Sequence, residues 1–522
     1  MEVGVRIVGV ILRLINFLLH PLFWLASARG PKLRVPPPKP LHLRSATDLA
    51  RAVRDGEMTS EELVAAFIER VKEVNPILNA VVDERYASAL VEAKEVDRQI
   101  EEARTNGKSQ EMFQKKPLLG VPFTVKESCS LAGMSNSVGC LENAGSRATT
   151  DGAAVRLVKE AGAIPLLVSN TPELCLGWET TNLLNGTTNN PYCVSHTPGG
   201  SSGGEGALLA CGASVFSVAS DIAGSIRLPA AFCGVFGHKP TPGIIPIEGH
   251  IPTLNDENYP KFLTVGPMTR KAEDLPLLLN IMAGDNRSKF RLDEPVDLSK
   301  LKVLYMTEAT DAIPLMPVHS GIKQAVRAAA RCLAEGGATL SQEKFEELEN
   351  SVELSISVFF SMKDIPNMLQ DPTNPKRQRS LLVELLKHIV GGASRSLQAL
   401  GFTLIDKTNL FIPEHRRSHY CERADKLREH MTRTLGTDGV FLYPVFTGPA
   451  HRHHEVFARA SGVLYTMLFN VLGLPATAVP VGLCGALPLA IQVIAGPNQD
   501  RLCIAVARQL EIGFGGWRHP RQ

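Results

Sequence analysis

The chain has 522 residues, of which 44% are hydrophobic and 21% are charged, and its formal net charge is +2. This composition is ordinary for a globular protein with a large core. The near-neutral charge argues against a broadly electrostatic nucleic-acid binder, so we expect no nucleic acid partner. The ten cysteines include no CxxC pair, which fits neither a disulfide scaffold nor a zinc ribbon, and we expect most of them to be small buried residues.

An apolar segment covers positions 3–28 and is broken by two arginines, His20 and Pro21. Its uncharged part, 14–28, is shorter than the roughly 20 residues of a comfortable membrane span. We expect residues 1–30 to be a membrane anchor, either a spanning helix or a kinked or hairpin segment in one leaflet. A cleaved signal peptide and a helix packed on a soluble body are the alternatives.

The sequence around this segment favours an intracellular membrane. Basic residues are in excess after the apolar segment, which favours a cytoplasmic body by the positive-inside rule. We expect the endoplasmic reticulum or a lipid droplet, because a proline-broken hairpin needs no second aqueous face. Residues 31–42, which include PKLRVPPPKP, are predicted to form a stiff spacer.

The body, which we place at 43–517, alternates helical and strand patterns. Two amphipathic helices are predicted between 45 and 75, with Ser45 and Thr59 as N-caps. The remaining predicted elements are a buried strand within 118–128 that reaches Lys126, a helix followed by a strand over 151–170 and again over 206–221, strands at 301–306, 439–446, 475–483 and 488–496, and a helix at 498–511. This order predicts an α/β fold, a single large domain with a mixed central β-sheet flanked by helices on both faces.

Two stretches stand outside this alternation. Residues 364–379 are polar and irregular, and we expect a loop or an insertion there. Residues 380–412 form a broad apolar stretch that predicts a pair of packed helices.

The glycine-rich stretch 196–234 reads HTPGGSSGGEGALLACGASVFSVASDIAGSIRLPAAFCG. A phosphate-binding loop needs GxxxxGK[ST], and no such lysine follows these glycines. Gly199–Gly203 matches GxSxG, but a nucleophile elbow directly follows a buried strand, whereas turn-forming residues precede this match. We therefore interpret the match as accidental. A flexible linker is also disfavoured, because the glycines flank a patterned helix and strand.

Ser225 is better placed for nucleophilic chemistry. It stands where a predicted strand ends and a helix begins, and the backbone N–H groups of a helix N-terminus can stabilise a developing oxyanion. His196 and His238 lie in no recognisable triad context. A lysine can act as the base when it is neutral, and burial of the predicted strand would favour the neutral amine of Lys126.

Five segments occur in an order that resembles the amidase signature family. They are GVPFTVKES (120–128), TPGGSSGGEGAL (197–208), SDIAGSIRLPAAFCGVFGHKPT (220–241), GPMTR (266–270) and LPLAIQVIAGP (487–497). The resemblance extends from about 43 to 517 and is strongest to the membrane-anchored fatty-acid amide hydrolases within the family.

The resemblance implies a role for each residue of this site. Ser225 matches the nucleophile that becomes acylated, Ser201 matches a bridging serine after a cis peptide bond, and Lys126 matches the base that acts through Ser201. Such a relay suits amide cleavage, which needs a protonated amine leaving group. The oxyanion loop corresponds to Ile222, Ala223 and Gly224 together with the amide of Ser225, and the residues that support the site correspond to Ser202, Asp221 and Arg227.

One residue departs from the family pattern, because Ala223 stands where the family has the first glycine of Asp-x-Gly-Gly-Ser. If that position needs a positive φ, alanine would strain the turn by roughly 1–2 kcal/mol. If φ is negative, nothing is lost.

A second motif, HRHHE at 451–455, offers three histidines and a carboxylate. Zinc binding is one interpretation, but the motif is not a helical HExxH, so we favour a loop and expect no metal site.

The resemblance implies a membrane-associated amidase that hydrolyses fatty-acid amides, of the N-acylethanolamine or primary-amide type, to a fatty acid and an amine or ammonia. Esters should also react, and no metal or organic cofactor is implied, since lysine and serine supply the proton transfers. Membrane lipid and a homodimer partner would fit, with residues of about 380–413 forming a membrane-facing cap. The alternatives are an amidase of small or peptide-like amides, a transamidating subunit that needs partner subunits, and an inactive membrane-bound lipid-binding protein.

Overall fold

The computed structural model describes residues 1–29, 33–309, 315–363, 365, 367–371, 374–408 and 412–520. An 11-stranded sheet forms its centre, in the order β1-β3-β2-β6-β8-β7-β14-β15-β13-β9-β10. These strands are β1 (Val81–Glu84), β2 (Pro122–Lys126), β3 (Ile164–Ser169), β6 (Phe216–Asp221), β7 (Phe236–Lys239), β8 (Thr264–Thr269), β9 (Lys302–Tyr305), β10 (Thr339–Leu340), β13 (Gly439–Pro444), β14 (Ala476–Cys484) and β15 (Leu487–Ala495). The pair β2–β6 is parallel and the pair β6–β8 is antiparallel, so the sheet is mixed, as predicted.

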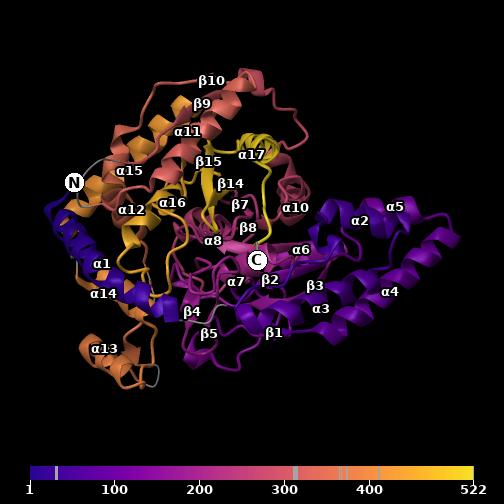
Figure 1. Ribbon diagram of the computed structural model, residues 1–522, viewed down its shortest axis with the longest axis horizontal. Helices are drawn as coiled ribbons and strands as arrows, with labels where there is room; N and C mark the ends of the chain where they lie inside the picture. The colour runs from indigo at the N-terminus through magenta and orange to yellow at the C-terminus, as the bar shows by residue number, and fades with distance from the viewer. Residues whose placement is uncertain are drawn as a thin grey trace.

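Helices surround this sheet (Figure 1). They are α1 (Val3–Arg29), α2 (Ala46–Asp55), α3 (Ser60–Leu78), α4 (Tyr86–Thr105), α5 (Ser109–Lys115), α6 (Ala153–Glu160), α7 (Gly203–Ala210), α8 (Arg227–Cys233), α9 (Tyr259–Phe262), α10 (Asp274–Ala283), α11 (Ser320–Glu335), α12 (Ser351–Phe359), α13 (Leu381–Ile389), α14 (Leu397–Thr408), α15 (Glu414–Leu435), α16 (Leu464–Val471) and α17 (Asp500–Phe514). Two small hairpins lie apart from the main sheet, β4 (Thr181–Asn182) with β5 (Gly186–Thr187), and β11 (Gln370–Asp371) with β12 (Asn374–Gln378).

Consecutive residues of β7 show that helices cover both faces of the sheet, because side chains alternate between the faces along a strand. A Cβ on Gly237 would lie against Ala230 of α8. The imidazole of the next residue, His238, instead contacts Asp500 at the start of α17. The two helices therefore lie on opposite faces, and the predicted α/β architecture is confirmed.

The strands that carry the glycine-rich site are buried along their whole length. Every residue of β2, β3 and β6 is buried, as expected for parallel strands covered on both faces. Phe123 of β2 stacks on Phe216 of β6 with ring centroids 5.3 Å apart. The predicted buried strand that reaches Lys126 is confirmed as β2.

The first helices of the body begin at the predicted caps. The side chain of Ser45 accepts a hydrogen bond from the amide of Asp48 at the start of α2. The side chain of Thr59 accepts a hydrogen bond from the amide of Glu62, and the side chain of Glu62 accepts one from the amide of Thr59. α3 therefore begins with a capping box. Both helix starts are therefore encoded locally.

Two strands in the middle of the sheet, β7 and β8, have no counterpart among the predicted elements. β7 is FGHK and β8 is TVGPMT, and their short length, glycine and proline give little strand signal. Their pairing with each other and with β6 and β14 completes the hydrogen-bonding ladder. Position in the sheet, not local propensity, makes these segments strands.

Two smaller expectations are corrected. Part of the stretch 364–379, where a polar loop or an insertion is expected, forms the β11–β12 hairpin, while positions 364, 366, 372 and 373 lie outside the described residues. All ten cysteines are free thiols, and half of them, rather than most, are buried.

The N-terminal apolar segment forms the single helix α1, which continues through Pro21 instead of reversing there. The segment Val3–Leu25 is long and apolar enough to cross a membrane. Only 6% of its apolar 18-residue window is buried. The residue before α1 contacts the body, since a carboxylate oxygen of Glu2 lies 2.9 Å from Arg416 of α15. The exposed apolar side chains of α1 are Val3, Ile7, Val10, Ile11, Leu14, Ile15, Phe17, Leu18, Leu19, Leu22, Trp24 and Leu25.

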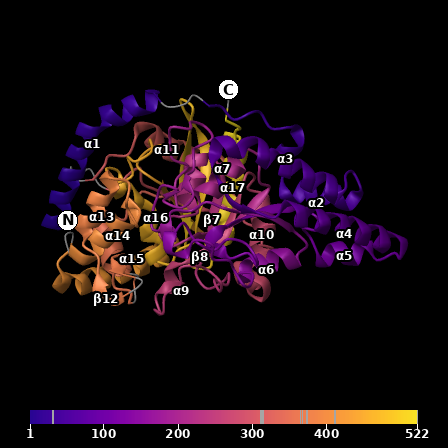
Figure 2. The same cartoon turned by 90° about the horizontal axis from the view of Figure 1, so that it is seen from below.

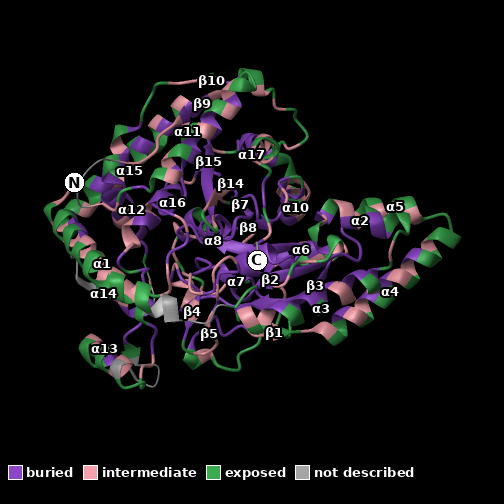
Figure 3. Ribbon diagram, viewed as in Figure 1, coloured by how far each residue is buried: buried purple, intermediate pink, exposed green. Residues whose placement is uncertain are grey.

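The apolar stretch at 380–412 contains the predicted helix pair as α13 and α14. Both helices lie on the same side of the molecule as α1 in two perpendicular views (Figures 1 and 2). Exposed residues follow α1 and α13 (Figure 3). The apolar ones on and beside the pair are Leu382, Val383, Leu385, Leu386, Val390, Leu397 and Leu404. We call this set of side chains, together with those of α1, the apolar face.

Candidate active site

Lys126 is the last residue of β2 and is fully buried. Its Nζ lies 2.7 Å from Oγ of Ser201 and 2.9 Å from Oγ of Ser220. β2 and β6 are parallel, with Val125 opposite Val218, so their carboxyl ends meet at one edge of the sheet. This register places the side-chain amine of Lys126 beside Ser220, near the end of β6.

Ser201 lies in the loop that leads into α7, and the Gly200–Ser201 peptide bond is cis. The loop packs tightly against a neighbouring backbone, because a Cβ on Gly200 would lie 2.7 Å from the carbonyl oxygen of Gly177. The amide of Ser202 donates to the carbonyl of Ser225 at 3.2 Å. This bond joins the glycine-rich loop to the turn that carries Ser225.

Ser225 lies in the turn between β6 and α8 and is 3% exposed. The turn is built around Asp221, the last residue of β6. One carboxylate oxygen accepts from the amide of Gly224 at 2.7 Å, and the other accepts from the amide of Ile226 at 3.1 Å. The two amides that flank Ser225 are thus fixed by one side chain.

Arg227 forms a fully buried ion pair with Asp221, with Nε 3.1 Å from Oδ2. Burial alone would raise the pKa of Asp221, but the charge and hydrogen bonds of Arg227, with a bond from Asn470, outweigh burial and hold this pKa below its usual range. The guanidinium also donates to Gln492 of β15 at 2.9 Å. The ion pair therefore connects the turn to the sheet and to α16.

The oxyanion-loop sequence Ile222-Ala223-Gly224 has its positive φ at Gly224, where φ is 105°. The φ of Ala223 is not positive, so alanine at this position introduces no left-handed strain. A Cβ on Gly224 would lie 2.1 Å from Oγ1 of Thr466, whose hydroxyl donates to the carbonyl of Ala223 at 3.2 Å. Of positions 223 and 224, only 224 therefore requires glycine.

Three residues at this site were not predicted from the sequence. Ser220 contacts Lys126, and its Oγ also lies 2.9 Å from Nε2 of His250 in the loop between β7 and β8. Asn470 of α16 donates to both the carbonyl and the carboxylate of Asp221, at 3.1 and 2.9 Å. The alternation along β6 could have indicated Ser220, which lies at the same sheet edge as Lys126. Asn470 is 249 residues from its partner, so only the fold reveals it.

The histidines considered as bases lie elsewhere. His238 bridges Oγ1 of Thr477 at 2.7 Å and Oδ1 of Asp500 at 3.1 Å. His196 lies before the glycine-rich loop and forms an isolated β-bridge with Arg452. Burial lowers the pKa of His196 to about 3, with the charge of Arg452 adding to the effect. Neither imidazole is among the side chains that contact Lys126 or Ser201 in the described part of the chain.

The HRHHE motif forms a loop that supports the glycine-rich loop. The amide of Thr197 donates to the carbonyl of His451 at 2.9 Å. Nδ1 of His453 lies 2.7 Å from the buried carboxylate of Glu179, and Glu455 is paired with Arg459 at 3.1 Å. His453 and the carboxylate of Glu455 therefore bind protein partners.

A second buried carboxyl group, Glu205 of α7, lies behind β2, where it accepts a hydrogen bond from Thr124. Burial raises the pKa of Glu205 to about 7, although the hydrogen bond from Thr124 acts in the opposite direction.

Residues 62–504 of this chain match the family model of the Amidase family. Among curated relatives, fatty-acid amide hydrolase 2-A of Danio rerio is 40% identical over 529 residues, covering 99% of this chain and 97% of the relative. Human fatty-acid amide hydrolase 2 is 38% identical over 504 residues, covering 94% of this chain and 93% of the relative.

Solved structures share the fold at lower identity. A fatty acid amide hydrolase aligns with a TM-score of 0.73 at 21% identity, covering 91% of this chain and 86% of that one. A peptide amidase from Stenotrophomonas maltophilia aligns with a TM-score of 0.71 at 23% identity, covering 92% and 99%.

The oxyanion loop yields a stability prediction. We expect Gly224→Ala to cost about 2–4 kcal/mol, because it combines a left-handed φ with a collision against Thr466. The matched exchange Ala223→Gly should stay within about 1 kcal/mol of the wild type. Denaturant unfolding of both variants provides the measurement, and equal losses would contradict the φ assignment of the loop.

Glu205 predicts a pH dependence of stability. Its folded pKa of about 7 lies above the unfolded value of 4.5, so between these pH values only the folded state binds the proton. The contribution of Glu205 to the free energy of unfolding should therefore be greatest below pH 4.5. It should fall by about 3 kcal/mol as the pH rises to 7, and then level off.

The matched variant Glu205→Gln keeps the shape and removes the titration. The difference in unfolding free energy between the variant and the wild type, measured from pH 5 to 8, should grow with pH in favour of the variant. A difference that does not change with pH would show that Glu205 is ionised throughout.

Proposed function

Because the chain is an amide-hydrolysing enzyme of the amidase signature family, we propose that it cleaves fatty-acid amides through a Ser225–Ser201–Lys126 relay. The observation that carries the relay is the 2.7 Å contact between the buried amine of Lys126 and Oγ of Ser201. A buried amine beside a hydroxyl is suited to take a proton when it is neutral.

In the proposed acylation, neutral Lys126 takes the proton of Ser201 while Ser201 takes that of Ser225. Oγ of Ser225 then forms a bond to the carbonyl carbon of the amide, and the carbonyl oxygen becomes an oxyanion. Collapse of this intermediate breaks the C–N bond as the proton returns from the Lys126 ammonium, through Ser201, to the leaving nitrogen. The products are an acyl-enzyme and a neutral amine.

Water completes the cycle by the same route. It loses a proton through Ser201 to Lys126, adds to the acyl carbon, and releases the fatty acid as Ser225 regains its proton. The oxyanion of both steps would be stabilised by backbone amides of the 222–225 loop. The amide of Gly224 is bonded to Asp221, so the neighbouring amides of Ile222, Ala223 and Ser225 are the candidate donors.

An aromatic group in the same hydrophobic cluster as the oxyanion loop supports an acyl-chain substrate. Phe359, the last residue of α12, and Phe360 after it contact Phe402 of α14 with ring centroids 6.2 and 5.2 Å apart. Ile222 and Ala223 belong to the same apolar cluster. Apolar side chains of this kind suit a hydrocarbon chain, and the relatives described above are named as fatty-acid amide hydrolases.

The apolar face supports association with a membrane. α1 is exposed along an apolar length sufficient for a span, and α13 and α14 lie on the same side of the molecule (Figure 2). Exposed leucines and valines on a soluble surface are costly, whereas lipid tails cover them without penalty. We propose that α1 anchors the protein to an intracellular membrane, the endoplasmic reticulum or a lipid droplet, and that α13 and α14 form a cap at that membrane.

The cap is joined to the loop that supports the site. The side chain of Gln398 in α14 binds the backbone of Glu179, accepting from its amide at 3.2 Å and donating to its carbonyl at 2.9 Å. Arg395 pairs with Glu173 at 3.0 Å. These contacts hold the start of α14 against the segment that precedes the glycine-rich loop.

The relay predicts that Ser225→Ala and Lys126→Ala each lower kcat for a long-chain acyl amide by at least about 100-fold, because each removes a group that forms or breaks a bond. Ser201→Ala should have a comparable effect. Hydrolysis of long-chain and short-chain acyl amides by the purified full chain provides the measurement. Turnover of short amides alone would contradict the fatty-acid assignment, and wild-type rates in Lys126→Ala would contradict the relay.

The cap predicts a substrate-selective effect. Leu386→Glu places a charge on the apolar face and should lower kcat/KM for long-chain amides presented in lipid vesicles by about tenfold, since it opposes membrane contact. A short soluble amide should react normally. Val91→Glu on α4, which is also exposed but lies away from the apolar face (Figure 1), is the matched control. Equal slowing of both substrates by Leu386→Glu would contradict the cap.

A further inference from the structure

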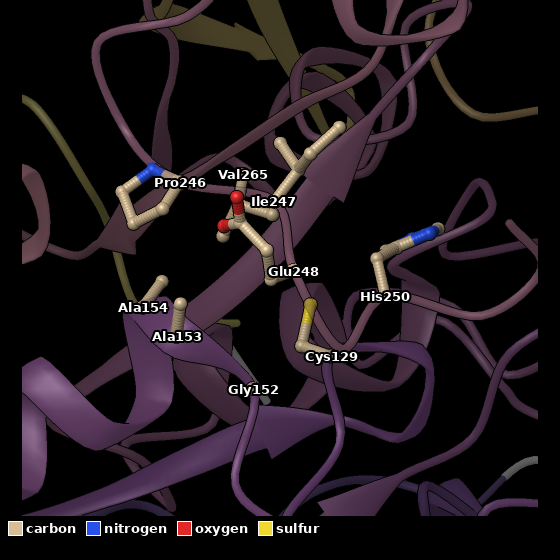
Figure 4. Close-up of a pocket in the computed structure, with 9 residues that line it drawn as sticks. All are labelled: Cys129, Gly152, Ala153, Ala154, Pro246, Ile247, Glu248, His250 and Val265. Carbon is tan, nitrogen blue, oxygen red and sulfur yellow. The ribbon is translucent and has the colours of Figure 1, made fainter. Parts of the chain in front are cut away.

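His250 lies in the loop between β7 and β8, with its backbone joined to the segment that follows Lys126. The amide of the next residue, Ile251, donates to the carbonyl of Ser128 at 2.9 Å. The side chain is buried and lines a small cavity with Cys129, Gly152 and others, but its imidazole points away from the other lining side chains (Figure 4). The ring instead reaches Ser220, with Nε2 2.9 Å from Oγ.

The contacts of Nδ1 determine which ring nitrogen of His250 carries the proton. Nδ1 lies 3.2 Å from the carbonyl oxygen of Pro252 and 3.2 Å from the hydroxyl of Tyr259. A carbonyl oxygen only accepts, and the Tyr259 hydroxyl donates its proton to that same carbonyl. Both neighbours of Nδ1 are therefore acceptors for it, so Nδ1 is protonated and Nε2 of the neutral ring has a lone pair.

This tautomer sets the direction of the hydrogen bond at Ser220. Because Nε2 of His250 accepts, the hydroxyl of Ser220 donates to it, and the Ser220 oxygen is left to accept from the amine of Lys126 at 2.9 Å. Burial lowers the pKa of His250 to about 3, so the ring stays neutral in the physiological range.

A neutral lysine amine has two N–H groups and one lone pair. It serves as a base toward Ser201 only when the lone pair faces the Ser201 hydroxyl at 2.7 Å. If Ser220 were free to turn its hydroxyl toward Lys126, it would occupy that same lone pair. A group that holds the Ser220 proton on the other side removes this competition.

We propose that His250 is a positioning residue, which holds the proton of Ser220 away from Lys126 so that the lone pair of the amine faces Ser201. His250 acts only through Ser220 and touches neither substrate nor the reacting atoms. The inference rests on the proposed relay and extends it by one hydrogen bond.

The test compares two substitutions that fill similar space. The amide oxygen of Gln in His250→Gln can accept the Ser220 hydroxyl, whereas Leu in His250→Leu cannot. We expect His250→Leu to lower kcat about 10- to 100-fold, a part of the 10²–10⁴ contributed by a general base, with KM unchanged within about twofold. His250→Gln should retain kcat within about threefold. Thermal midpoints of both variants, matched to the wild type, identify variants that fold.

A double-mutant cycle with Ser220→Ala supplies the decisive measurement. Because His250 acts through Ser220, adding His250→Leu to Ser220→Ala should change kcat by less than about twofold. A purely structural role would instead lower kcat by the same factor in both backgrounds. Equal impairment of His250→Gln and His250→Leu, or a full effect in the Ser220→Ala background, would overturn the inference.

Two controls separate this result from a failure of the proposed function. If the wild type hydrolyses acyl amides and Lys126→Ala does not, the relay stands, and an unimpaired His250→Leu overturns the positioning role alone. If the wild type neither hydrolyses amides nor reacts at Ser225 with a fluorophosphonate probe, the proposed function fails and the inference fails with it.

Discussion

The buried ion pair of Asp221 and Arg227 holds together the turn on which Ser225 stands. The same carboxylate binds the amides of Gly224 and Ile226, on either side of that serine. Exchanging such a pair for apolar residues costs little in many proteins, whereas removing one partner leaves an uncompensated buried charge. The pair is therefore better understood as a device that fixes backbone geometry than as a source of stability. It also joins the turn to α16 and β15, so elements far along the chain help to position the hydroxyl of Ser225.

A second constraint is that the polar groups around Lys126 are buried inside an apolar sheet. Buried polar atoms are costly unless they are paired, and in this site pairing is achieved by a chain of side chains from separate elements. Lys126 comes from β2, Ser201 from the loop before α7, and Ser220 from β6. Since each hydroxyl in such a chain both donates and accepts, the direction of one bond determines the direction of the next. The arrangement that satisfies the buried groups is also the one that suits proton transfer.

The apolar face and the site are connected through loops rather than through the sheet. Gln398 of α14 binds the backbone of Glu179, and the carboxylate of Glu179 binds His453 in the HRHHE loop. That loop pairs with the residues that precede the glycine-rich loop through Thr197. The motif that offered a metal-binding interpretation is thus a link between the proposed cap and the segment that carries Ser201.

The sequence by itself determined the features that depend on neighbours along the chain. Apolar patterning predicted the buried strand that ends at Lys126, local capping chemistry predicted the start of α3 at Thr59, and the ordered motifs pointed to Ser201 and Ser225. Only the tertiary structure decided which distant groups meet. His250 and Asn470 carry no local signal, since their partners are supplied by elements far along the chain. The φ of Ala223 likewise depends on how the turn closes around Asp221, and a one-dimensional pattern holds no information on that closure.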